Sequence, residues 1–328
     1  MKRICSTVIF AVLMALSSPA SAAQDATEMF NAIVKIRATV PGDARTASTL
    51  GTEREGYGVV IDSKGHILTI GYLIVEADTI EIIGPDDKSA RGTFVGYDHN
   101  TGFGLLRPDK PLNVAPVKIG RSSEVKEGDP VLVAGHGGPD GAGAARVISR
   151  KEFAGYWEYL LEDAIFTVPA YPDFAGAALI NRDGQLVGIG SLLSQVMIPG
   201  LGSIATNIFV PIDLLQPILT DLITLGRPRK APRPWLGLNV EEARGRVFVN
   251  RVTSKGPAEK AGLKPDDLIL AVNGKPVNGL ADFYRKVWAL GNAGAEVPLS
   301  VLKGNDIHSI TLHSVDRHQF LQLRQRKI

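Results

Sequence analysis

Hydrophobic residues in this chain occur mostly in short runs, and polar turn residues separate one run from the next. Residues 32–40, for example, read AIVKIRATV and are rich in β-branched side chains. Such runs, bounded by Gly, Pro, Asn or Asp, are typical of β-strands. The expected strands of the first set are 32–40, 58–61, 66–70, 80–83, 92–95 and 104–106. Strands at this spacing predict a barrel or a sandwich.

A second set of apolar runs predicts a second barrel. Its expected strands are 130–134, 145–149, 164–168, 177–180, 186–189 and 203–210. Between two of them lies Asn181–Gly184 (NRDG), whose Asp-Gly pair predicts a hairpin turn. Residues 211–225 instead carry apolar positions at helical spacing and stop at Gly226, which predicts a helix.

A basic, proline-rich stretch then marks a domain boundary. Residues 227–234 read RPRKAPRP, a composition that favours a stiff, extended linker. Residues 235–315 predict a smaller α+β unit of strands and two helices, the second over 280–290. Residues 316–328 are polar and mostly basic, and we expect a solvated tail there. The larger, mainly β unit therefore covers residues 23–226.

Residues 1–22 have the pattern of a secretory signal peptide. Lys2 and Arg3 precede an apolar run at 8–16, and Ala20-Ser21-Ala22 forms a small-residue cleavage site. The apolar run is too short for a transmembrane helix, so we expect no integral membrane segment. Cleavage near Ala22 predicts a periplasmic or secreted mature protein.

The charge balance, the cysteine content and the histidine spacing argue against several classes of partner and cofactor. The sequence has 36 basic and 34 acidic residues, and loss of Lys2 and Arg3 with the leader makes the mature chain nearly neutral. Near-neutral charge argues against a nucleic-acid partner. Cys5, the only cysteine, lies in the leader, so the mature chain has no disulfide. The histidines lack the helical i, i+4 spacing of zinc proteases, and we expect no metal and no cofactor.

Residues 171–181 (YPDFAGAALIN) resemble the nucleophile loop of the trypsin-like HtrA/Deg proteases, which reads Gly-Asn-Ser-Gly-Gly-Pro-Leu-Val-Asn. In this comparison Asp173 and Phe174 take the Gly-Asn places, Ala175 takes the place of the serine, and Gly176 matches. The resemblance extends over nearly the whole mature chain. It implies a mainly β fold, in which a trypsin-like double β-barrel is followed by a PDZ domain of α+β type.

The same resemblance locates the other two members of the catalytic triad. Residues 65–69 (GHILT) match the strand before the family's histidine, which puts Tyr72 in its place. Residues 100–106 (NTGFGLL) match the segment of the aspartate, which puts Gly102 there. A triad needs a hydroxyl, an imidazole and a carboxylate, and a phenol with a pKa near 10 is a poor base. From positions 72, 102 and 175 we therefore expect an inactive homologue rather than an enzyme.

The backbone N–H groups of Asp173 and Ala175 would form the oxyanion hole. An aspartate is less suited than glycine to a left-handed backbone, and its carboxylate would lie beside a pocket for an anion. Phe174 has the size to fill the old cleft. The alternative, in which Asp173 simply points to solvent, is equally open.

Residues 235–238 (Trp235, Leu236, Gly237, Leu238) resemble the carboxylate-binding loop of an HtrA-type PDZ domain. In such a loop, successive backbone N–H groups hold a C-terminal carboxylate, and the ligand adds as a strand to the edge of the sheet. The groove would lie between the strand of Leu238 and the helix 280–290, with Phe283 and Val287 as candidate pocket residues. Both side chains are equally explained as ordinary core positions.

Together these features predict an exported HtrA/Deg-like pseudoprotease that binds peptides or protein C-termini through its PDZ domain. Its expected role is to regulate, or to assemble with, an active HtrA-type protease in envelope protein quality control. The resemblance implies a homo- or hetero-oligomer, specifically a trimer. Two alternatives stay open: an endopeptidase with a non-standard mechanism, and a chaperone-like holder of unfolded polypeptides.

Overall fold

The computed structural model describes residues 26–198, 200 and 202–323, so the predicted leader 1–22 lies outside the described residues. Six antiparallel strands close the first barrel in the order β1-β2-β3-β6-β5-β4. These strands are β1 (Ile33–Thr39), β2 (Glu53–Val60), β3 (Ile67–Ile70), β4 (Thr79–Ile83), β5 (Ser89–Tyr97) and β6 (Phe103–Pro108). Each expected strand of the first set is present, and the second begins earlier than predicted because Glu53–Tyr57 pairs with β1.

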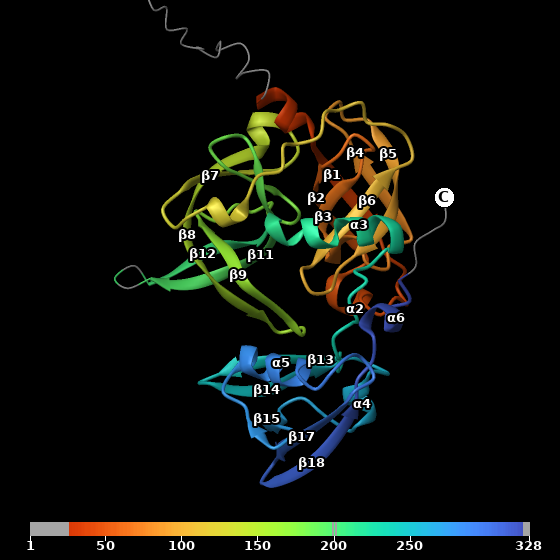
Figure 1. Cartoon of the computed structure of the whole chain (residues 1–328), viewed down its shortest axis with the longest axis vertical. Helices are drawn as coiled ribbons and strands as arrows, with labels where there is room; N and C mark the ends of the chain where they lie inside the picture. The colour runs from red at the N-terminus through yellow and green to blue at the C-terminus, as the bar shows by residue number, and fades with distance from the viewer. Residues whose placement is uncertain (1–25, 199, 201, 324–328) are drawn as a thin grey trace, which may run out of the picture.

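The second barrel closes in the order β10-β11-β12-β9-β8-β7 and stands beside the first (Figure 1). Its strands are β7 (Pro130–Ala134), β8 (Ala142–Gly155), β9 (Tyr159–Val168), β10 (Ala178–Ile180), β11 (Leu186–Ile198) and β12 (Gly202–Pro211). Strands β8 and β9 are much longer than predicted. The hairpin that they form extends beyond the barrel toward the smaller domain (Figure 1). Its tip forms part of the candidate functional site.

Short helices connect and cover the barrels. They are α2 (Ala47–Leu50), η1 (Gly71–Leu73), η2 (Ser122–Glu124), η3 (Gly138–Gly141), η4 (Ile212–Leu214) and α3 (Gln216–Leu225). The predicted stop of α3 at Gly226 is confirmed: this residue has φ +74° and its N–H donates to the carbonyl of Leu222. A side chain at Gly96 of β5 would lie 2.7 Å from that carbonyl oxygen, so α3 packs directly on the first barrel.

The smaller domain has one antiparallel sheet with helices packed against it. Its elements are β13 (Leu238–Ala243), β14 (Arg246–Val252), α4 (Pro257–Lys260), β15 (Leu268–Val272), β16 (Lys275–Pro276), α5 (Leu280–Trp288), β17 (Glu296–Lys303), β18 (Asp306–His313) and α6 (Arg317–Phe320). The sheet order is β13-β14-β15-β17-β18, with β16 paired to β15. Helix α5 buries Phe283, Tyr284 and Val287 against this sheet.

The segment after β18 is not the solvated tail that its polar composition predicts. Leu321 and Leu323 are buried and pack with Val75 and Tyr97 of the first barrel. Phe320 lies 4.7 Å from Trp235, measured between ring centroids. Two leucines and a phenylalanine within a polar stretch are enough to anchor it, because burial of each apolar side chain is favourable.

Candidate functional site

Tyr72, at the predicted histidine position, lies in η1 and faces the second barrel. Its hydroxyl donates a hydrogen bond of 2.8 Å to the carbonyl oxygen of Ser191. Burial raises the pKa of this phenol well above its ordinary value. The side chain is therefore a neutral hydrogen-bond donor that joins the two barrels.

Gly102, at the predicted aspartate position, has a left-handed backbone with φ +82°. Its carbonyl accepts a 2.7 Å hydrogen bond from the N–H of Gly71, which fixes it next to η1. A Cβ atom at this position would lie 3.3 Å from the hydroxyl of Tyr159 and 3.2 Å from Ile70. Tyr159, whose hydroxyl donates to the Thr101 carbonyl, thus occupies the space beside position 102.

Ala175, at the predicted serine position, sits in a tightly packed loop. Its carbonyl accepts a 2.8 Å hydrogen bond from the N–H of Tyr57 in the first barrel. A Cβ atom at Gly176 would lie 2.0 Å from the carbonyl oxygen of Tyr57, and one at Gly190 would lie 1.9 Å from that of Phe174. Both glycines are therefore required for this close backbone packing, which holds position 175 firmly in place.

Asp173 is exposed and does not belong to the described residues with a left-handed backbone. Its carboxylate therefore faces solvent without the backbone strain that the sequence comparison raised. The pKa of the nearby Tyr57 phenol is raised to about 12, first by burial and then by the negative charge of Asp173. Phe174 is half-buried, and its carbonyl accepts a hydrogen bond from Ala177.

Positions 72, 102 and 175 thus offer a neutral phenol, a glycine backbone and a methyl group. A Ser-His-Asp mechanism has no hydroxyl nucleophile, imidazole or carboxylate at these three places. Their equivalence to the triad of the resembling proteases stays a prediction. Within the described ranges, no group of three or more His, Cys, Asp or Glu side chains could hold a metal ion.

Residues 236–238 lie in the segment 235–238 that the sequence predicts to bind a carboxylate, and in the structure their N–H groups contact a carboxylate of the chain itself. The N–H groups of Gly237 and Leu238 donate to Oε1 of Glu158 at 2.8 and 2.9 Å. The N–H of Leu236 donates to Oε2 at 2.9 Å. Gly237 has φ +75°, the left-handed backbone that turns these donors toward one point. Trp235 flanks the loop and is 7% exposed.

The occupant comes from the tip of the hairpin between β8 and β9. The carbonyl of Tyr156 accepts a 2.8 Å hydrogen bond from the N–H of Val240 in β13. The hydroxyl of Tyr284 in α5 donates to the Gly155 carbonyl at 2.6 Å and accepts from the N–H of Glu158 at 3.1 Å. Residues 155–158 therefore lie along the groove between β13 and α5, as the sequence predicts for a bound peptide.

Phe283 and Val287, the candidate pocket residues, are 0% and 1% exposed. They belong to the same apolar cluster as Leu236 and Leu238, and Leu160 of β9 enters this cluster from the barrel domain. The structure places both residues in the apolar cluster to which the leucines of the loop belong. Their role in binding a ligand side chain stays a prediction.

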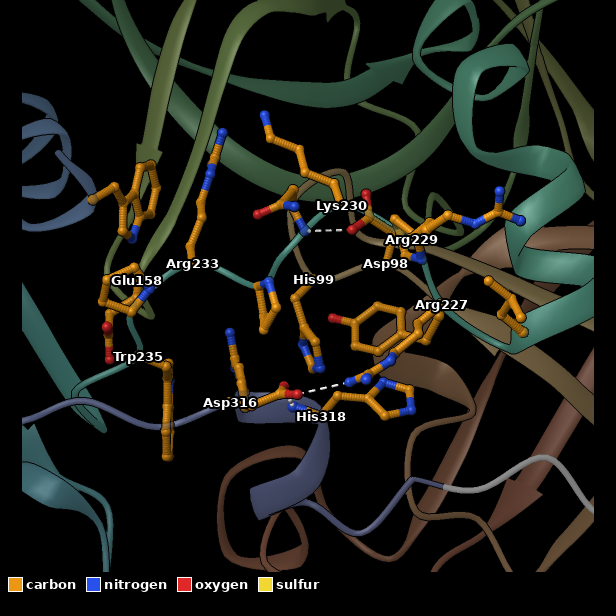
Figure 2. Close-up of a pocket in the computed structure, with 18 residues that line it drawn as sticks. Asp98, His99, Glu158, Arg227, Arg229, Lys230, Arg233, Trp235, Asp316 and His318 are labelled. Carbon is orange, nitrogen blue, oxygen red and sulfur yellow. Dashed lines mark hydrogen bonds and ion pairs between the residues drawn. The ribbon is translucent and has the colours of Figure 1, made fainter. Parts of the chain in front are cut away.

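Glu158 is 7% exposed and lies at the wall of a cavity of about 370 Å³ between the domains (Figure 2). Burial raises the pKa of its carboxyl to about 7, while the loop N–H donors and the charge of Arg317 act in the opposite direction. Basic side chains outnumber acidic ones in the lining of the cavity, and Figure 2 shows Arg227 paired with Asp316. Burial lowers the pKa of His99 and of His318, which also line it.

Sequence reasoning missed Glu158, Tyr156 and Tyr284. One signal was present in the sequence: residues 155–159 read GYWEY, an aromatic cluster around a single acid between two strands. Large aromatic side chains at a hairpin tip indicate a surface that packs against something else.

Two family models match the chain. A trypsin-like peptidase domain model matches residues 56–189, and a PDZ domain model matches residues 234–313. The predicted fold class, a mainly β protein with a trypsin-like domain followed by a PDZ domain, is confirmed. None of the helices in the described residues is long and apolar enough to cross a membrane.

The chain is also similar to named proteases. It is 28% identical over 278 residues to a probable periplasmic serine protease do/HhoA-like from Haemophilus influenzae, covering 78% of this chain and 57% of the relative. It is 30% identical over 288 residues to a probable periplasmic serine endoprotease DegP-like from Pseudomonas fluorescens, covering 82% and 56%. The solved HtrA-type protease AlgW with decapeptide shares this fold, with a TM-score of 0.54, 22% identity, and coverage of 90% of this chain and 98% of that one. The chain spans little more than half the length of these curated relatives.

These names overturn the expectation that the chain is not an enzyme. Both curated relatives are named as serine proteases or endoproteases, which points to protease activity. The expectation rested on side chains at positions 72, 102 and 175. Their chemistry argues against one catalytic mechanism at those positions, and it does not exclude a different arrangement for hydrolysing a peptide bond.

Proposed function

Because the chain joins a trypsin-like peptidase domain to a PDZ domain and is similar to HtrA-type periplasmic proteases, we propose that it binds and cleaves unfolded polypeptides in the periplasm. The observation that carries the proposal is the convergence of the N–H groups of residues 236–238 on one carboxylate. A polypeptide C-terminus presents the same acceptor, so this loop is suited to capturing chain ends. The expected signal peptide at 1–22 supports export.

Cleavage by this chain would use a non-standard arrangement. In the loop around Ala175, the backbone N–H groups of Asp173 and Ala175 take the oxyanion-hole places in the resemblance to trypsin-like proteases and would stabilise an oxyanion. Position 175 carries no nucleophile, so the attacking group is another hydroxyl or a water molecule. The exposed carboxylate of Asp173 lies on this loop, and its negative charge would weaken oxyanion stabilisation.

This proposal is tested by incubating residues 23–328 with a reduced, carboxymethylated protein and identifying new N-termini by mass spectrometry. Asp173→Asn removes the charge near the two N–H groups, and we expect it to increase the rate of cleavage. Asp183→Asn, in the exposed turn of Asn181–Gly184, is the matched control and should leave the rate unchanged. If no new N-termini appear, or if both variants change the rate equally, cleavage at this loop is ruled out.

Holding of unfolded polypeptides is a second candidate function. The methyl group at position 175 and the neutral phenol of Tyr72 are compatible with it, because holding needs no catalytic group. It predicts suppressed aggregation of the same substrate, measured by light scattering. The suppression should disappear when a peptide with a free C-terminus is added in excess.

Assembly belongs to the same proposal. Similarity to HtrA-type proteases supports an oligomer, either of this chain alone or mixed with an active HtrA-type protease. Light scattering of the purified chain, with and without such a protease, distinguishes a monomer from a trimer and from a mixed assembly.

A further inference from the structure

All the N–H donors at the carboxylate-binding loop are engaged by the side chain of Glu158. The three N–H groups of residues 236–238 donate to its two oxygens at 2.8 to 2.9 Å. A peptide C-terminus needs these same donors, because successive backbone N–H groups are what such a loop provides. Two carboxylates cannot occupy the loop together, since they would compete for the donors and repel each other.

The backbone of the hairpin tip also takes the place of a ligand backbone. A peptide that adds to β13 pairs with the N–H of Val240, and in this structure that N–H donates to the Tyr156 carbonyl. On the opposite wall, Tyr284 donates to the Gly155 carbonyl and accepts from the N–H of Glu158. The ion pair of Arg285 with Glu152 adds a contact farther along the hairpin.

The conformation of the hairpin turn does not by itself favour a glutamate at position 158. Strands β8 and β9 pair up to Gly155 and Tyr159, which leaves a three-residue loop. Glu158 is the last residue of this loop and has φ +59°. Glycine is the usual residue at such a left-handed position, and a long side chain there is unfavourable. Contacts with the smaller domain are therefore what stabilise glutamate at this place.

An apolar side chain accompanies the carboxylate. Leu160 of β9 packs in the cluster that contains Leu236, Leu238, Phe283 and Val287. A ligand that replaces the hairpin therefore gains most if it offers an aliphatic side chain together with its carboxylate. This describes a C-terminal residue such as leucine.

We propose that residues 155–160 are an internal ligand of the PDZ groove, which a peptide ending in an aliphatic residue with a free carboxylate must displace. This inference rests on the peptide-binding part of the proposed function and adds its regulation. In the resting chain the groove is closed by the hairpin, so affinity for a chain end depends on releasing Glu158.

Release of the hairpin tip from the groove would also alter a cavity at the surface of the barrels. Trp157 stacks on Tyr159, with ring centroids 5.3 Å apart. Both rings line a cavity of about 230 Å³ together with Tyr72, Gly102 and Ser191. Withdrawal of the hairpin tip from the groove would therefore change the cavity wall beside positions 72 and 102.

The test uses a fluorescein-labelled decapeptide ending in Tyr-Trp-Leu with a free carboxylate, titrated into residues 23–328 by anisotropy. Glu158→Ala removes the internal carboxylate, and we expect it to bind the peptide about tenfold or more tighter than the wild type. Glu158→Gln should fall between them, because its amide nitrogen cannot accept the hydrogen bond from Leu236. The control is Glu162→Gln, at an exposed position on β9, and it should bind the peptide as tightly as the wild type. A peptide with an amidated C-terminus should bind neither the wild type nor any of the three variants.

Hydrogen exchange in the absence of peptide provides a second readout. The amides of residues 236–238 should exchange faster in Glu158→Ala than in Glu162→Gln, with both variants folded by circular dichroism. Equal peptide affinity in the wild type and Glu158→Ala would overturn the internal ligand. Faster exchange without peptide binding in any variant would instead overturn the peptide-binding part of the proposed function.

Discussion

The carboxylate of Glu158 accepts a hydrogen bond of 2.8 Å from the backbone N–H of Gly237, although the two residues belong to different domains. The N–H groups of Leu236 and Leu238 complete the contact. Hydrogen bonds from a row of backbone donors to one acidic group are strong, and burial protects them from competing water. This contact therefore contributes substantially to holding the smaller domain against the barrels.

The contact should depend on pH. Docking raises the pKa of Glu158 from its ordinary 4.5 to about 7, with burial as the main cause. A carboxyl whose pKa is raised takes up a proton when it docks, so docking is favoured fully below pH 4.5 and weakens as the pH rises through 7. Peptide affinity of the wild type should therefore be about threefold or more higher at pH 8 than at pH 5.5.

This pH dependence has a clear control. Besides Glu158 itself, the charged and titratable groups that act on it are Arg317 and Tyr284, and burial raises the pKa of Tyr284. His99 and His318 lie across the cavity and are common to all variants. Glu158→Gln should abolish the change in affinity between pH 5.5 and pH 8. A change of the same size in that variant would assign the effect to the histidines.

Gly237 and Gly245 form a matched pair for testing the loop. Both have a left-handed backbone, with φ +75° and +72°, but a Cβ at Gly237 would lie 3.3 Å from the Trp235 ring, whereas Gly245 has open space. Each Gly→Ala change should lower the free energy of unfolding by about 1 kcal/mol through backbone strain. Only Gly237→Ala should also weaken peptide binding, measured by anisotropy. Equal binding by both variants would show that residues 236–238 do not form the binding loop.

Much of the fold could be predicted from the sequence because its signals are local. Short β-prone runs between turn residues predicted the strands of both barrels, and the Asp-Gly turn at 181–184 predicted one hairpin of the second. The loop at residues 235–238 was predicted from its resemblance to a PDZ domain. The outer half of the hairpin was missed because residues 150–155 (RKEFAG) mix charges with apolar residues. Its strands extend beyond the barrel because the tip docks on another domain, which no local pattern records.

The occupant of the loop was equally invisible in the sequence. Glu158 lies 79 residues before Gly237, and a single glutamate carries no signal of its partner. Only the folded arrangement of β8, β9 and β13 brings the two together. The segment after β18 was wrongly predicted to be a solvated tail for the same reason. Leu321 packs against Tyr97 of the first barrel, and this contact depends on the folded arrangement of the two domains.

Tyr72 should prove to be a structural link between the barrels. Its buried hydroxyl donates to the carbonyl of Ser191, which is itself buried. Tyr72→Phe leaves that oxygen without its donor and should lower the free energy of unfolding by about 1 to 2 kcal/mol in urea denaturation. Tyr156→Phe, at an exposed tyrosine, is the control and should change it by less than about 0.5 kcal/mol. Equal stability of the two variants would contradict this role.

A serine at position 175 should not become a reactive nucleophile. Activation needs a base within hydrogen-bonding distance, and Tyr72 is a neutral phenol whose pKa is raised by burial. Ala175→Ser should therefore show no labelling by a fluorophosphonate probe, and its rate of cleaving unfolded substrate should equal that of the wild type. Labelling of Ser at this position would mean that another side chain serves as its base.

The central claim is that a bound chain end and the hairpin tip exclude each other, and hydrogen exchange across residues 152–160 tests it most directly. The wild-type chain is compared with and without a saturating peptide that has a free C-terminal carboxylate. The account predicts faster exchange of the hairpin tip when the peptide is bound, and no change with the amidated peptide. Unchanged protection of the tip while the peptide is bound would contradict it, because Glu158 would then not need to leave the loop.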